Sequence, residues 1–191
     1  MRIKKICIAL AVVSGVFAFG ADEHYADVAL GYSLDTITHS PYVNTNQASG
    51  FYFDVDVMKT TGSGWMFGMG LDANTWTADA SASGVSGADA GYTIYTAGLS
   101  AKAGYNFDTK LDLPIKIKAA YGYGIASQGK SNGAGAQYDG ALEYTFFEGI
   151  AFGVKHKHVQ AKILQYDMNF DSTIAYFSFP IGRDIISVDK H

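Results

Sequence analysis

The chain has 191 residues, with 18 acidic and 14 basic side chains and a formal net charge of −4 at pH 7. This acidic balance disfavours nucleic acid as a partner, because a phosphate-binding surface must be basic. The length suits one domain, but 22 Gly, 13 Tyr and 12 Phe against only 3 Pro are unusual for a water-soluble globule.

Residues 1–20 have the pattern of a secretory signal peptide. The basic start MRIKK precedes the apolar stretch ICIALAVVSGVFAF, and Ala18 and Gly20 are small residues where a signal peptidase reads the chain. We expect an exported protein cut after Gly20. Cleavage would remove Cys7, the only cysteine, and three of 14 bases but none of 18 acids, which moves the charge to −7. The mature chain would then lack disulfides and cysteine-based metal sites.

Hydrophobic and polar side chains alternate along eight segments, which is the period of two typical of strands with unlike faces. The clearest example is the stretch from Pro114 to Ala126, where Ile115 and Ile117 alternate with Lys116 and Lys118. The eight segments are 25–34, 51–59, 65–74, 92–107, 114–126, 137–146, 151–158 and 172–181.

The connections between these segments alternate in length. Residues 60–64, 108–113 and 147–150 form short connections, whereas residues 35–50, 75–91, 127–136 and 159–171 are predicted as longer polar loops. This order predicts an all-β, even-stranded antiparallel meander, with all the short turns at one end.

Two closed barrels fit this pattern. A soluble lipocalin-type barrel turns its apolar face inward around a ligand, whereas a transmembrane barrel turns that face toward lipid. The polar faces carry six acids and five bases, which can neutralise one another inside an eight-stranded barrel, whose interior is just wide enough for side chains. The predicted lumen ion-pair network consists of Asp27, Asp54, Asp56, Asp72, Lys102, Lys116, Lys118, Asp139, Glu143, Lys155 and Lys157.

Aromatic residues gather near both ends of the predicted strands, as they do where a barrel meets the two membrane surfaces. At the short-turn end the predicted girdle contains Tyr25, Trp65, Tyr105, Phe107, Phe146 and Phe179. At the long-loop end it contains Phe51, Trp76, Tyr92, Tyr123 and Tyr138. Inward glycines, among them Gly70 and Gly153, would make room for long charged neighbours. These features favour the transmembrane barrel.

On this pattern and layout, residues 21–181 resemble the small eight-stranded outer-membrane barrels of Gram-negative bacteria, the OmpA-transmembrane-domain and OmpX-like group. The resemblance implies an eight-stranded antiparallel up-and-down transmembrane β-barrel, with short periplasmic turns and longer extracellular loops. The short tail 182–191 lacks the terminal aromatic that the assembly machinery of such barrels usually reads, so Phe177 and Phe179 are expected to serve instead.

A P-loop pattern, G-x-x-x-x-G-K-S, runs from Gly124 to Ser131. A working P-loop needs a helix directly after the motif, because the amides of the helix N-terminus hold the phosphates. Here the stretch NGAGAQYDG follows, which has the composition of a turn or loop. We therefore interpret the match as accidental.

Two further patterns bear on chemistry. His156 and His158 share a face at a spacing that can hold zinc, but no third ligand is evident. The stretch KHVQA is similar to the His-x-Ser-Asn stretch of outer-membrane lipid A deacylases, with Gln160 where the nucleophilic serine would stand. That substitution speaks against the same chemistry here.

The sequence thus predicts an integral outer-membrane barrel with a filled, charge-paired lumen and a structural or surface-interaction role, without catalysis, cofactor or metal. Expected partners are outer-membrane lipid, lipopolysaccharide and the barrel-assembly machinery, with an extracellular partner through the long loops, and we expect a monomer. The alternatives are a periplasmic lipocalin-like ligand-binding barrel and a lipid A-modifying enzyme.

Overall fold

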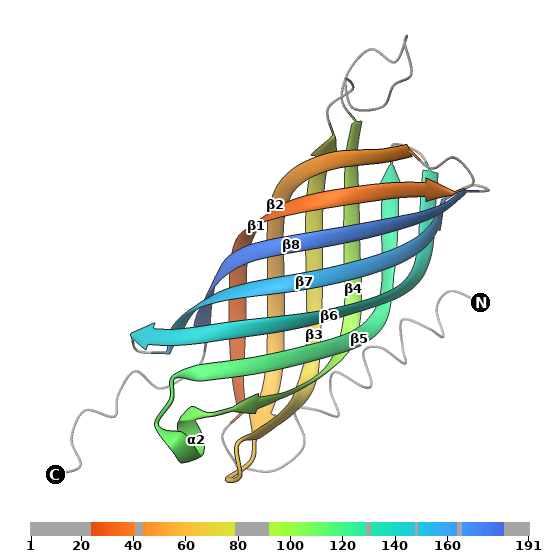
Figure 1. The fold of residues 1–191 in the computed structure, drawn as a ribbon. Helices are drawn as coiled ribbons and strands as arrows, with labels where there is room; N and C mark the ends of the chain where they lie inside the picture. Colours follow the sequence, from red (N-terminus) through yellow and green to blue (C-terminus); the bar gives the residue numbers. More distant parts are fainter. Residues whose placement is uncertain are drawn as a thin grey trace, which may run out of the picture.

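The computed structural model describes residues 24–40, 44–78, 92–128, 131–147, 149–163 and 166–181. The predicted signal peptide and the tail 182–191 lie outside these residues. The described chain is almost entirely strand (Figure 1). The elements are β1 (His24–Ser40), β2 (Asn44–Thr60), β3 (Trp65–Ala78), β4 (Tyr92–Asn106), α2 (Asp108–Leu111), β5 (Ile115–Gln128), β6 (Ser131–Phe147), β7 (Ile150–Ile163) and β8 (Tyr166–Ile181).

The eight strands form one closed antiparallel barrel in chain order, with β1 paired to β8. This confirms the predicted all-β, up-and-down architecture. Paired residues followed once around the wall from Phe67 lead back to β3 at Thr77, ten residues further along. A stagger of this size tilts the strands strongly and leaves an interior that side chains can fill.

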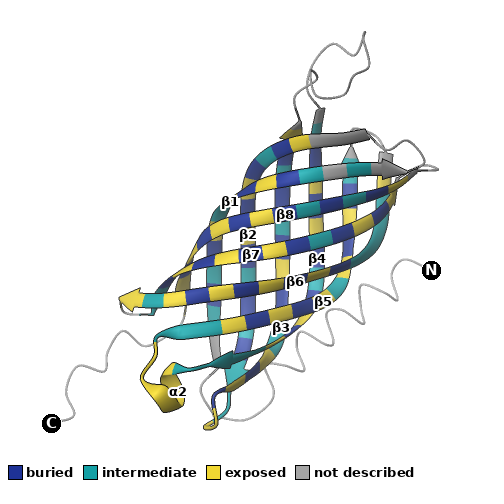
Figure 2. Ribbon diagram, viewed as in Figure 1, coloured by how far each residue is buried: buried dark blue, intermediate teal, exposed yellow. Residues whose placement is uncertain are grey.

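The wall has two unlike faces, which alternate along every strand (Figure 2). On β2, Phe53 is 44% exposed and points outward, whereas its neighbour Asp54 is 2% exposed and points to the axis. On β5, Ile117 is 44% exposed and Lys118 is 7% exposed. The apolar face therefore surrounds the barrel and the charged face lines the lumen.

The strands extend further than the sequence predicted. β1 continues to Ser40, β2 begins at Asn44, and β5 to β8 run through most of residues 127–136 and 159–171. The prediction of long loops in 35–50, 127–136 and 159–171 was therefore wrong. The outward side chains of these stretches are mostly polar, so the apolar alternation is lost while the backbone pairing between strands continues.

The connections that follow β2, β4 and β6 lie at one end of the barrel, which we call the turn end; the opposite end is the loop end. At the turn end a tight turn joins β2 to β3 and places Gly64 at φ 93°, a backbone conformation that favours glycine. α2 joins β4 to β5, and a turn at Gly149 (φ 85°) precedes β7. No helix among the described residues is long and apolar enough to cross a membrane.

Candidate functional site in the barrel lumen

The strands bring the predicted charged residues of the lumen into one interior. Ten of the eleven are buried, and Lys116 is partly buried toward the turn end. The buried ten, together called the charge network, are Asp27, Asp54, Asp56, Asp72, Lys102, Lys118, Asp139, Glu143, Lys155 and Lys157.

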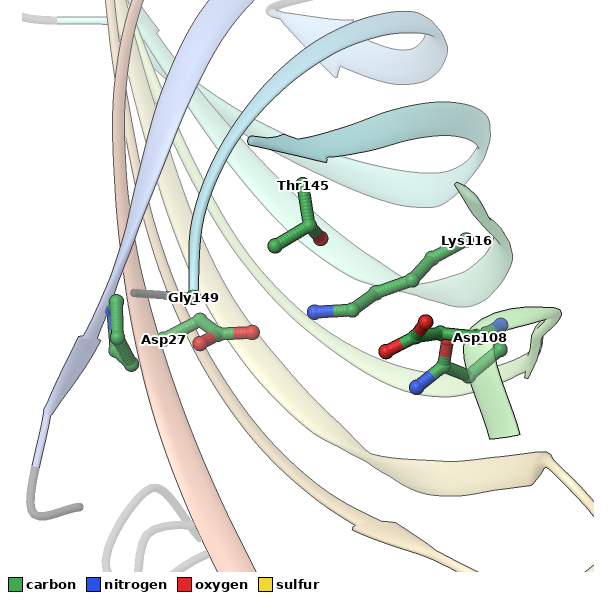
Figure 3. A pocket seen from close by; sticks show the side chains of 7 residues that line it. Asp27, Asp108, Lys116, Thr145 and Gly149 are labelled. Carbon is green, nitrogen blue, oxygen red and sulfur yellow. Dashed lines mark hydrogen bonds between the residues drawn. The ribbon is translucent and has the colours of Figure 1, made fainter. Parts of the chain in front are cut away.

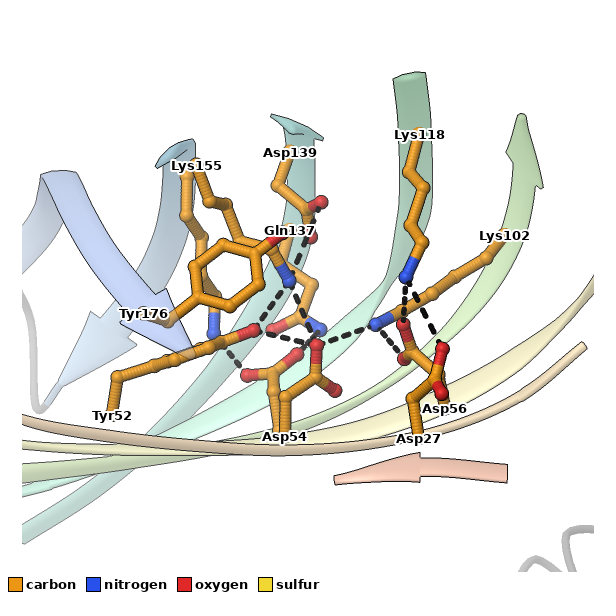
Figure 4. A network of polar contacts seen from close by, with 12 residues as sticks. Asp27, Tyr52, Asp54, Asp56, Lys102, Lys118, Gln137, Asp139, Lys155 and Tyr176 are labelled. Carbon is orange, nitrogen blue, oxygen red and sulfur yellow. Dashed lines mark hydrogen bonds and ion pairs between the residues drawn. The ribbon is translucent and has the colours of Figure 1, made fainter. Parts of the chain in front are cut away.

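Asp54 on β2 lies at the centre of the charge network (Figure 4). Its Oδ2 atom accepts hydrogen bonds from Lys102 Nζ at 2.7 Å and from Lys155 Nζ at 2.8 Å. The Tyr52 hydroxyl donates to the same oxygen at 2.6 Å, and Lys102 also pairs with Asp56. Two lysines from opposite parts of the wall thus share one carboxylate.

Lys118 on β5 joins three carboxylates nearer the turn end. Its Nζ atom lies 2.8 Å from Glu143 Oε1, 3.4 Å from Asp56 Oδ2 and 3.8 Å from Asp27 Oδ2. The Tyr176 hydroxyl donates to the same Glu143 oxygen at 2.8 Å. Because this lysine is 7% exposed, the carboxylates take the place of water around its charge.

A third group of the charge network lies toward the loop end. Lys157, which is fully buried, pairs with Asp72 Oδ1, and the Gln137 amide donates to Asp72 Oδ2 at 2.8 Å. Asp139 is farther from its cation, with 3.8 Å between its Oδ1 atom and Lys155 Nζ. The pairing therefore extends along the lumen as a chain of contacts.

Several polar partners in the lumen were not among the predicted site residues. Tyr52, Tyr176 and Gln137 donate hydrogen bonds to the carboxylates, and period-two alternation does place all three on inward positions. Asp35 is 4% exposed and accepts a hydrogen bond from the Ser33 hydroxyl at 2.8 Å. Sequence reasoning missed Asp35 because residues 35–50 were assigned to a loop.

Inward glycines leave room for this packing, as the sequence suggested. A Cβ atom added at Gly70 would lie 2.5 Å from both Lys102 Nζ and Asp56 Oδ1. One added at Gly153 would meet the phenol ring of Tyr176. Side chains of the opposite or neighbouring wall thus occupy the space that these glycines leave empty.

The lumen opens into a small polar cavity of about 60 Å³ at the turn end, here called the vestibule (Figure 3). The Oδ2 atom of Asp27 and the Oγ1 atom of Thr145 are buried without a hydrogen-bond partner in the described residues. The vestibule is lined by Asp27, Asn106, Asp108, Lys116, Thr145, Gly149 and Pro180.

A cluster of apolar side chains fills part of the lumen toward the loop end, which the sequence did not predict. The rings of Trp76 and Phe170 stack with their centroids 4.8 Å apart, although β3 and β8 are not neighbours in the sheet. The prediction that Trp76 belongs to the outer girdle was wrong, since its exposure is 0%. The buried cluster, here called the apolar layer, contains Ala48, Trp76, Ile94, Ala126, Val159, Ala161, Met168 and Phe170.

The remaining girdle predictions concern the outer wall. Phe51, Tyr123 and Tyr138 are exposed toward the loop end, and Trp65 and Phe146 toward the turn end. The partly exposed ring of Tyr105 lies beside Trp65, and that of Phe107 lies beside Tyr105. Phe179 is exposed on β8. The side chains of Tyr25 and Tyr92 lie outside those the structure describes.

The other chemical motifs of the sequence lie away from the lumen. His158 Nδ1 is 2.5 Å from Asp171 Oδ1, and its ring stacks on Tyr138 on the outer wall. His156 and Gln160 are exposed on the same strand. Within the described residues no group of three or more His, Cys, Asp or Glu is placed to hold a metal ion.

The P-loop match falls across the β5–β6 connection. Gly124 lies inside β5 and Ser131 begins β6, while residues 129 and 130 lie outside those described. A strand therefore follows the motif where nucleotide binding needs a helix. The interpretation of the match as accidental agrees with this arrangement.

Comparison with known proteins finds similarity in structure alone. No family model and no curated protein matches the sequence. The attachment invasion locus protein Ail of Yersinia pestis, solved in complex with the heparin analogue sucrose octasulfate, gives a TM-score of 0.54 at 10% identity, over 82% of this chain and 99% of that one. Neisserial surface protein A gives a TM-score of 0.56 at 11% identity, and the match covers 82% of this chain and 98% of that one.

These similarities show the fold, since the identities are low. The chain has the fold of the small eight-stranded outer-membrane barrels, as the resemblance in the sequence implied. The neighbours align over almost their whole length, so this fold accounts for nearly all of each of them.

Proposed function

We propose that this protein is an integral outer-membrane barrel whose lumen is filled and whose role is structural or surface-interacting. The observation that carries the proposal is the division of the wall into an apolar outside and a charged, paired inside. Leu71, Leu142 and Phe177 are about half exposed on the outside of three different strands. Such a surface is stable in hydrocarbon and aggregates in water.

The lengths of the strands agree with this placement. A tilted strand needs about 9–11 residues to cross a bilayer, and these strands have 14 to 17. The strands project little beyond the apolar outer band at the turn end, so their surplus length extends from the loop end. By analogy with outer-membrane barrels, the proposal places the turn end in the periplasm and the loop end outside the cell.

The filled lumen supports a role other than that of an open pore. The charge network and the apolar layer together occupy the lumen between the vestibule and the loop end, and an eight-stranded wall leaves little further space. We propose that the chain is not an enzyme, and that it acts as a membrane-embedded support for its loop end.

A partner would meet the loop end, where the strands extend beyond the apolar band. Ail was solved with a heparin analogue, a polysulfated ligand. This chain has more acids than bases, so its charge does not favour a polyanion over other partners. The proposal therefore includes a surface interaction, with lipopolysaccharide and outer-membrane lipid as neighbours, without assigning a sulfated ligand.

Cell fractionation tests the proposal directly. We expect the protein to remain in the outer-membrane pellet after an alkaline carbonate wash and to be extracted only with detergent. Recovery in the soluble periplasmic fraction would contradict the proposal and favour the lipocalin-like alternative. In planar bilayers we expect no ion conductance above that of protein-free membranes.

The lipid A-modifying alternative has a separate test. His158 has an acidic neighbour in Asp171, but the residue two positions after it is the exposed Gln160, whose amide is not a nucleophile. We expect unchanged lipid A mass spectra when the gene is deleted. Loss of a modified lipid A species would support the enzyme and contradict the proposed non-catalytic role.

A further inference from the structure

We propose that the lumen is a blind vestibule, which water enters from the turn end as far as Asp27 and which the apolar layer closes at the loop end. This inference rests on the proposed membrane placement and adds to it a direction of access. It divides the lumen into three zones along its axis, namely the vestibule, the charge network and the apolar layer.

The vestibule has the properties of a hydrated site. Its volume of about 60 Å³ is enough for more than one water molecule, because a water needs at least about 10–15 Å³. Asp27 is 5% exposed, and its Oδ2 atom has no hydrogen-bond partner among the described residues, nor has Thr145 Oγ1. Both atoms belong to residues that line this cavity, and a polar atom without a hydrogen-bond partner is costly to bury, so the cavity favours water over empty space.

The apolar layer has the opposite properties. Trp76, Ile94, Val159 and Phe170 are each 0% exposed, although they lie near the loop ends of their strands. Trp76 is paired with Ile94, and Val159 with Phe170, so two cross-strand pairs meet through the stacked rings. A narrow constriction lined by such side chains excludes water, as hydrophobic gates do.

The transition between the zones lies just below the apolar layer. On the inner face of β4, Thr96 follows Ile94 by one inward position and is 3% exposed. Its hydroxyl oxygen has no hydrogen-bond partner among the described residues. A cysteine at this position therefore reports whether water reaches the lumen past the apolar layer.

Cysteine accessibility tests the proposal, because Cys7 is the only native cysteine. In a Cys7→Ser background refolded in detergent micelles, Thr145→Cys and Thr96→Cys are reacted separately with a small water-soluble thiol reagent. Because Thr145 is only partly buried and lines the vestibule, we expect the cysteine at 145 to react faster than the one at 96. We expect the one at 96 to react on the order of 100-fold more slowly, because its exposure requires a local opening.

The apolar layer is then removed. Adding Trp76→Ala and Phe170→Ala should accelerate the reaction at 96 at least about tenfold, since a removed barrier leaves the site open without local unfolding. The reaction at 145 should not change. The matched control is Phe51→Ala with Tyr123→Ala, which removes two rings that are 73% and 63% exposed on the outer wall and should leave both rates unchanged.

Two results would overturn the proposal. One is equal reactivity of the two cysteines in the otherwise native protein. The other is an unchanged rate at 96 in a double variant that still shows the heat-dependent gel mobility of a folded barrel. If the double variant does not fold, Phe170→Ala alone should give a smaller acceleration, and no acceleration contradicts the proposal. Either result would reject the blind vestibule but would not bear on the membrane location, which cell fractionation tests separately.

Discussion

The charge network and the apolar layer occupy the same lumen but keep it closed by different physical means. The charge network depends on complementary partners: Lys118 is held among three carboxylates within 4 Å. The apolar layer depends on volume, because Trp76 and Phe170 fill space and pair no charge. Removing one partner of a buried ion pair is therefore strongly destabilising. Replacing a buried apolar side chain by another of similar size and shape costs much less.

The largest effect that we expect comes from removing one cation of the charge network. Lys118→Met keeps much of the side-chain volume but leaves Glu143 and Asp56 with fewer partners. We expect a loss of about 3–5 kcal/mol in the free energy of unfolding, which is typical of breaking a buried pair. Urea unfolding in lipid vesicles, followed by tryptophan fluorescence, measures it, and a change below about 1 kcal/mol would show that the pairing contributes little.

A smaller effect is expected where the charge network fills the space beside a glycine. Gly70→Ala places a methyl group against Lys102 and Asp56, and overpacking of this kind costs about 1–3 kcal/mol. The matched control is Gly140→Ala on the outer wall, where an added Cβ meets nothing within 4 Å. Equal unfolding curves for the two variants would contradict the proposed packing around Gly70.

The apolar layer should tolerate a conservative change better. Phe170→Leu keeps an apolar side chain of related size, so we expect a loss below about 1.5 kcal/mol and a barrel that is still closed. The same urea titration measures it. A loss as large as that of Lys118→Met would mean that stacking with Trp76, rather than apolar volume, maintains the layer.

The smallest effect is expected at the rim of the charge network. Lys116 is only partly buried beside the vestibule, where water can replace a lost partner. For Lys116→Met we expect a loss below about 1 kcal/mol, in the range of exposed pairs. The difference between this variant and Lys118→Met, two residues away on the same strand, measures how steeply hydration falls along the lumen.

The sequence predicted the unlike faces of the wall because the alternation of apolar and polar residues is visible within each strand by itself. Phe53 beside Asp54 and Ile117 beside Lys118 are read from one strand at a time. The pairing between strands is different, since Lys118 of β5 reaches Asp56 of β2 only after the barrel closes with its particular stagger. No single segment contains that information, so the sequence indicated which residues share the lumen but not which of them pair.

The loop end was the least predictable region for a related reason. Toward the loop end the outward side chains are polar as well as many of the inward ones. Asp35 points inward and Thr36 outward, so the sequence there shows no alternation between apolar and polar residues. Residues 35–50 consequently have the composition of a loop, and the interior positions of Asp35 and Trp76 were missed. Burial in this region depends on contacts across the lumen, which composition does not record.

The proposed membrane placement requires that the apolar face of the barrel wall is turned toward lipid and the charged face toward the axis. NMR in lipid nanodiscs tests this with two isoleucines, Ile117 at 44% exposure and Ile174 at 0%. We expect cross-relaxation from lipid acyl chains to the methyl groups of Ile117 and none to those of Ile174. Lipid contacts at Ile174 with none at Ile117 would contradict the account, because the apolar face would then be turned toward the axis.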